Sequence, residues 1–220
     1  AMGAIMAVGV AVANAILLGW LGAKPAEGGY IIVARISTFY YFAYFAYVGA
    51  YSPYITLYLK DLGLAATQIG ILYAIPQVMR IFGPNAWGAL ADRSGEPVLI
   101  LRLAALAALG CFCLLYAGTS FAWIFGVLVA VHFFTSAQMP VVEALTLDVV
   151  RDAPGRYGRI RVWGSVSFIL AVLGLGVLLD HAPARAVLHV VAGLLALTVA
   201  ASLMVGRAVH RGTRGAASPV

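Results

Sequence analysis

Two charged residues stand out within the apolar part of the chain. Glu143 is the only glutamate inside a hydrophobic stretch, and Arg161 follows it 18 residues later, across a short polar loop. The midpoint of this hairpin is residue 152, so both side chains are expected about 10 Å inside adjacent antiparallel helices, at 1.5 Å per residue. Such a pair predicts a site for a polar or ionised solute. A structural salt bridge, or an Arg161 side chain that reaches the membrane interface, explains it too.

Other polar residues also lie inside apolar stretches. Arg80 follows Gln77 in the middle of its stretch and suits either an anionic solute or a structural role toward a neighbouring helix. His132 stands alone on an apolar segment and is typical of a packed core histidine. Asp148 is expected at a helix end, paired with a loop arginine. Polar residues in lipid need a partner or a water-filled cavity.

Six tyrosines mark one face of the stretch at 36–59. The two at the ends are expected in the interfacial aromatic belt. The middle ones predict the wall of a polar cavity, because buried hydroxyls need partners, although helix packing explains each single tyrosine as well. Their spacing of 4, 3, 4, 3 and 4 residues is helical, and they are Tyr40, Tyr44, Tyr47, Tyr51, Tyr54 and Tyr58.

The composition requires a membrane protein. Of the 220 residues, 63% are hydrophobic and 10% charged, and the mean hydropathy is +0.98. This excludes a soluble enzyme, a disordered chain and a secreted disulfide module. An all-α polytopic protein is expected, because the apolar runs are too long for barrel strands and do not alternate. Seven runs lie at about 4–22, 36–59, 67–91, 97–117, 121–148, 160–179 and 186–206.

These runs predict three regions. Residues 1–35 form an extra hydrophobic helix and a cytoplasmic linker, residues 36–206 a unit of six transmembrane helices, and residues 207–220 a polar, basic tail. With the 23–35 loop inside, 11 Lys and Arg residues lie on or near the cytoplasmic side and 2 outside. The excess of basic residues therefore indicates topology and not binding to nucleic acid.

Proline interrupts two runs at related places. Pro53 and Pro140 lie at equivalent positions if residues 36–206 form three plus three helices. Interrupted helices at corresponding positions of two inverted repeats are typical of a transporter site.

Other classes of protein are less consistent with the sequence. The chain has no phosphate loop, nucleophile–base or metal-ligand motif, so no enzyme, cofactor or metal is expected. Seven runs suggest a seven-helix receptor, but the run at 186–206 lacks the lysine that a retinal protein needs. A membrane subunit that does not itself transport is the other alternative.

The segment between the runs at 67–91 and 97–117 resembles the signature loop of the major facilitator superfamily, which joins helices two and three. Gly88, Asp92, Arg93 and Gly95 match its pattern. The two basic residues that normally follow are replaced here by the Glu96–Pro97 dipeptide.

Two further segments are similar to the lactose permease group, and the second resembles its phenylpropionate-permease-like branch. They are residues 49–54 and the combination of 140–144 with 157–165. The resemblance implies that Glu143 and Arg161 bind substrate and that Phe168 stands near a stacking position. Tyr47, Tyr51, Tyr54 and Arg80 complete the predicted substrate site.

The resemblance also implies a function. It is secondary transport by alternating access, for a small organic solute such as an aromatic or other organic acid, with proton symport and a bacterial inner membrane location. Such transporters have twelve helices in two halves, and residues 36–206 match the N-terminal half. The expected partners are therefore the lipid bilayer, the small-molecule substrate, and a C-terminal half or a second copy.

Overall fold

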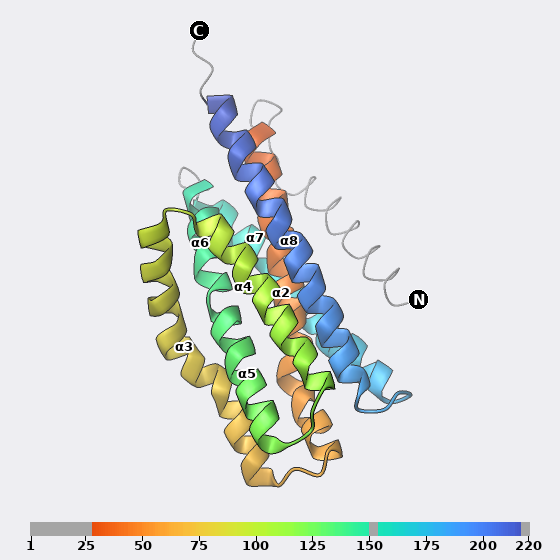
Figure 1. The fold of residues 1–220 in the computed structure, drawn as a ribbon. Coiled ribbons are helices and arrows are strands. Elements are labelled where there is room, and N and C mark those ends of the chain that lie inside the picture. The colour runs from red at the N-terminus through yellow and green to blue at the C-terminus, as the bar shows by residue number, and fades with distance from the viewer. Residues whose placement is uncertain (1–27, 150–153, 217–220) are drawn as a thin grey trace.

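The computed structural model describes residues 28–149 and 154–216, and Figure 1 shows the order of its helices. The predicted extra helix at 4–22 lies outside these residues. The described part is all helical, as expected. Its elements are α2 (Gly28–Asp61), α3 (Ala66–Ser94), α4 (Pro97–Cys113), the short 3-10 helix η2 (Leu114–Tyr116), α5 (Phe121–Ser136), α6 (Gln138–Val149), α7 (Pro154–Leu179) and α8 (Ala186–Ala216).

Four described spans are long and apolar enough to cross a membrane: Pro97–Tyr116, Phe121–Leu147, Tyr157–Leu179 and Ala186–Val205. The α2 and α3 helices are longer, at 34 and 29 residues, but α2 carries the tyrosine stripe and α3 carries Gln77 and Arg80. A helix that faces a polar cavity need not be apolar all round. Together the helices form an all-α polytopic membrane protein.

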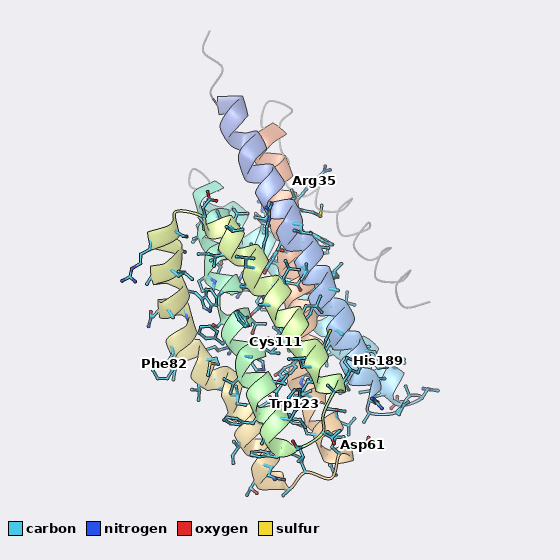
Figure 2. The ribbon with its side chains drawn as sticks, in the orientation of Figure 1. Arg35, Asp61, Phe82, Cys111, Trp123 and His189 are labelled. Atoms are coloured by element: carbon cyan, nitrogen blue, oxygen red, sulfur yellow. The ribbon has the colours of Figure 1, made fainter. Side chains whose placement is uncertain are left out.

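The α2 helix is central to the bundle. It packs against α7 and α8, while α4 packs between α8 and α5, and α3 packs against α5. In Figure 1, α3 lies at the left edge beside α5, and α8 runs from the upper end of the molecule toward the lower right. Arg35 and Asp61 mark opposite ends of α2 in Figure 2.

Close contact between α2 and α7 depends on glycine. A Cβ at Gly49 would lie 2.7 Å from the Phe168 carbonyl oxygen, and one at Gly164 would lie 2.7 Å from the Phe45 ring. Small residues let membrane helices approach closely, because dispersion contacts drive their association.

Several helices extend beyond the predicted bounds. The α2 helix begins at Gly28, so the predicted linker at 23–35 is wrong in its second part, and α7 begins at Pro154 instead of 160. The α8 helix continues to Ala216, through most of the predicted tail. The reason is that hydropathy reports the thickness of the lipid, whereas a helix continues into water as long as its backbone bonds are satisfied.

The two prolines have different effects. The run at 121–148 is broken at Ala137, between α5 and α6, three residues before Pro140, as predicted. The α2 helix, in contrast, continues through Pro53, so the predicted interruption there is wrong. A single proline removes one backbone hydrogen bond, and tight packing of α2 against α7 keeps the helix in register.

Candidate functional site

The α6 and α7 helices bring the predicted charged pair together. The Arg161 Nε atom lies 3.7 Å from Glu143 Oε1, and the Tyr157 hydroxyl donates to the same oxygen at 3.4 Å. The two charged side chains are 37% and 35% exposed. Hairpin geometry is sufficient to explain this proximity, since both residues lie near one short connection.

Aromatic rings of α2 cover the guanidinium of this pair. The Arg161 Cζ atom lies 4.5 Å from the ring centre of Phe45 and 5.6 Å from that of Tyr41. A cation over an aromatic face is stabilised by the ring quadrupole. The Arg161 charge is therefore balanced by Glu143 and shielded by α2.

A polar cavity of about 70 Å³ lies between α2, α3 and α5. Three helices contribute its polar lining: Tyr44, Tyr47 and Tyr51 from α2, Gln77 and Arg80 from α3, and His132 from α5. Of the predicted site residues, the structure thus brings Tyr47, Tyr51 and Arg80 together here. It places Glu143 and Arg161 outside the cavity lining.

His132 is tied to the tyrosine face. Its Nε2 atom lies 2.8 Å from the Tyr51 hydroxyl, and the two ring centres are 4.9 Å apart in an edge-on arrangement. His132 is buried, as expected for a core histidine, but it also lines the cavity. Both descriptions of this residue therefore hold.

Two polar groups of the cavity have no partner within the described residues. The buried Tyr47 hydroxyl lies near Thr135 but makes no hydrogen bond of good geometry. Arg80 makes no hydrogen bond or ion pair there, although His132 and Tyr44 lie within electrostatic range of its charge. The cavity therefore holds uncompensated positive charge and a free hydroxyl donor.

Tyr44 links the cavity to the ion pair. It lies within electrostatic range of both Arg80 and Glu143. Its ring centre is 6.0 Å from that of Tyr47, which in turn is 5.8 Å from that of Tyr51. The two charged sites therefore lie along one continuous aromatic face of α2.

Two predicted cavity residues do not line the cavity. The Tyr54 hydroxyl donates a 2.8 Å hydrogen bond to the Val172 carbonyl of α7, and Phe168 packs its backbone against Gly49. Tyr54 belongs to the same stripe as Tyr47 and Tyr51, but its side chain meets α7 instead of α3 and α5. Helical spacing cannot distinguish between these neighbours.

The tyrosines at the two ends of the stripe are also placed differently from the prediction. Tyr40 is 0% exposed and Tyr58 is 4% exposed, so the expectation of interfacial belt positions is wrong for both. Tyr40 packs in a cluster with residues of α4, α6, α7 and α8, and Tyr58 packs in the larger core cluster of the bundle.

Three neighbours of the predicted site were not assigned to it from the sequence. They are Tyr44, His132 and Tyr157. Tyr44 carries the same stripe signal as its neighbours, and Tyr157 lies four residues before Arg161, one helical turn away. His132 was predicted to be a core histidine and not a site residue, because no spacing connects it to Tyr51, its partner 81 residues away.

The resemblance-based loop motif lies at the junction of α3 and α4. Gly95 has φ of 64° and ends α3, with its N–H bonded to the Ala91 carbonyl. This left-handed position favours glycine. Asp92 and Arg93 belong to the last turn of α3 and not to a loop, and the Asp92 side chain lies outside the described part.

These features define the class of protein. A polytopic helical bundle with a polar cavity lined by a charged residue, here Arg80, is typical of membrane transport proteins. The chain belongs to the MFS_1 like family, whose sequence model matches residues 33–216. This confirms the resemblance to the major facilitator superfamily. A second model, that of cytochrome b(C-terminal)/b6/petD, matches residues 2–42, most of which lie outside the described part.

Curated relatives agree with the family. The chain is 37% identical over 165 residues to a maltose permease of Geobacillus stearothermophilus, covering 74% of the chain and 41% of the relative. It is 32% identical over 167 residues to a probable 3-phenylpropionic acid transporter of Escherichia coli, covering 74% and 42%. The chain thus spans about two fifths of their length. These relatives are named as transporters and not enzymes, in agreement with the sequence prediction. No solved structure matches the chain.

Proposed function

We propose that this chain provides one half of a secondary transporter, which moves a small organic solute across the membrane by alternating access. The observation that carries the proposal is the polar cavity between α2, α3 and α5, where the exposed Arg80 side chain forms part of the wall. Such a cavity is costly in a membrane protein and suits a solute path. In this proposal a second half, either further chain or a second copy, closes the other side of the cavity.

The proposed substrate is an aromatic or other organic acid. Substrate binding involves Glu143 and Arg161, with Tyr47, Tyr51 and Arg80 in the cavity wall. Tyr54 and Phe168 act at the contact between α2 and α7, where they hold the wall in place. The cap at Gly95, with Gly88, Asp92 and Arg93 before it, serves as the conformational element between α3 and α4.

Symport with protons and an inner membrane location belong to the same proposal. The support for both is membership of the family and the bacterial origin of the relatives. The structure contributes a hydrogen bond between the His132 and Tyr51 side chains at the wall of the cavity.

The test is uptake of radiolabelled 3-phenylpropionate and maltose by bacterial cells that produce the protein as its gene encodes it. We expect uptake of the acid, stimulated by an inward proton gradient and abolished by a protonophore. Glu143→Gln and Arg161→Gln should each reduce it strongly, whereas Arg185→Gln, in the exposed connection before α8, should not. Unimpaired uptake in both site variants would remove the site assignment, and insensitivity to the protonophore would remove proton symport.

A further inference from the structure

We propose that the cavity is a carboxylate subsite in which Arg80 and Tyr47 bind the acidic group of the substrate, and that Arg161 does not take this charge. The inference rests on the proposed transport function and deepens it. It assigns the substrate's negative charge to Arg80, which has no counter-charge among the described residues, and not to Arg161, which is paired with Glu143.

Arg80 is the cation without a counter-charge. It lies in the middle of α3, 14 residues from each end, or about 21 Å from either end at 1.5 Å per residue. No carboxylate lines the cavity, and Arg80 makes no ion pair with the described residues. A charge at this depth needs a partner or a water-filled space. An anionic ligand in the cavity supplies the partner.

Arg161 is in the opposite situation. Its Nε atom lies 3.7 Å from a Glu143 oxygen, and its guanidinium lies over the Phe45 ring. A carboxylate that bound there would have to displace Glu143 or lie beside it, at the cost of repulsion between like charges. The ion pair is therefore better suited to hydroxyl or other neutral groups of a solute than to its charge.

Tyr47 supplies a second, independent indication. Its hydroxyl is buried in the wall of the same cavity and has no hydrogen-bond partner within the described residues. A buried donor without a partner carries a free-energy cost, which a ligand acceptor relieves. A carboxylate has two oxygens, so a single ligand in the cavity can accept from a guanidinium and from a hydroxyl.

The rest of the cavity suits an apolar, flat body. The rings of Tyr44, Tyr47 and Tyr51 follow one another at centre distances of 6.0 and 5.8 Å, and His132 continues the row. Offset and edge-on aromatic contacts at 4.5–7 Å are favourable. We therefore infer a small organic acid with an unsaturated or aromatic body as the ligand class.

Binding to the purified full protein in detergent micelles tests the proposal. The probes are 3-phenylpropionate and 3-phenylpropanamide, which share one body and differ in charge. The wild type should bind the acid more tightly. Arg80→Gln should lower the affinity for the acid by about 10- to 100-fold, and Tyr47→Phe should lower it by about 3- to 10-fold. The affinity for the amide should be unchanged in both variants. Arg80→Lys should retain part of the preference.

Two controls separate the subsite from general damage. Arg185→Gln removes an exposed positive charge outside the bundle and should leave the preference intact. Retained amide binding reports that each variant is folded. If Arg80→Gln binds neither probe, the Arg80→Lys and Tyr47→Phe variants provide the test. The proposal is overturned if both of them prefer the acid over the amide as strongly as the wild type does.

Two results contradict the subsite directly. One is equal binding of acid and amide by the wild type, and the other is loss of the preference in Arg161→Gln but not in Arg80→Gln. Failure of the transport proposal looks different, because cells would then show no uptake of either radiolabelled solute while the purified protein still preferred the acid.

Discussion

The Tyr40 hydroxyl donates a 2.8 Å hydrogen bond to the Gln138 Oε1 atom, and both side chains are fully buried. Gln138 is the first residue of α6, directly after the break that follows α5, and its Nε2 atom has no partner within the described part. This one bond ties the central helix to the broken span. It holds the break beside the aromatic face, between the cavity and the ion pair.

We expect Tyr40→Phe to destabilise the protein by about 1 kcal/mol, because the substitution removes the one hydrogen bond that the buried Gln138 side chain makes with the described residues. The measurement is the free energy of unfolding in detergent micelles. The control is Tyr73→Phe, whose exposed hydroxyl lies 3.3 Å from that of Ser52. If both variants lose the same free energy of unfolding, the hydrogen bond to Gln138 contributes no more to stability than the exposed contact of Tyr73.

Removal of either charge of the ion pair should destabilise the protein, because the other charge then lacks a partner. Since both side chains are about one third exposed, we expect only about 1 kcal/mol for Glu143→Gln or Arg161→Gln. The double variant should recover most of this stability without recovering uptake. A double variant as unstable as the sum of the two single ones would mean that the residues do not interact.

Gly49→Ala should disrupt the packing of α2 on α7. The new Cβ would lie 2.7 Å from the Phe168 carbonyl oxygen, which is backbone and cannot rotate away. We expect a loss of about 1–3 kcal/mol in the free energy of unfolding. Gly110→Ala is the matched control, because nothing lies within 4 Å of its Cβ, and it should be neutral or stabilise by up to about 1 kcal/mol. Similar effects in both variants would argue against a close α2–α7 contact.

The predicted orientation can be tested by cysteine labelling. In a protein with Cys111 and Cys113 replaced by serine, a Thr119→Cys residue before α5 should react with an impermeant maleimide added to intact cells. A Ser94→Cys residue at the end of α3 should react only after the membrane is opened, because the basic residues favour the cytoplasmic side. The reverse pattern would invert the topology.

Much of the fold was predictable because hydropathy and helical periodicity are local signals. The six core runs correspond to helices, with the fourth broken before Pro140 as expected. The proximity of Glu143 to Arg161 was also predictable, since one short hairpin joins them. The prediction for Pro53 was wrong because the effect of a proline depends on what packs around the helix.

The candidate site was likewise predictable only where its residues are close in sequence. The tyrosine stripe assigns Tyr44, Tyr47 and Tyr51 to one face of one helix, but it also includes Tyr54, which bonds to α7. His132 meets Tyr51 across 81 residues of sequence, and no spacing rule connects them. Which tyrosine lines the cavity is thus decided by the positions of α3, α5 and α7 around α2.

The sequence by itself determined that this is a helical membrane protein, because composition and periodicity are local signals. The major facilitator superfamily followed from the resemblance of short motifs, and the proximity of Glu143 and Arg161 followed from the one short connection between them. The tertiary structure decided that Arg161 has a counter-charge and a ring cover while Arg80 has neither among the described residues. The reason is physical: whether a charge is compensated depends on which side chains distant helices place within a few ångströms of it.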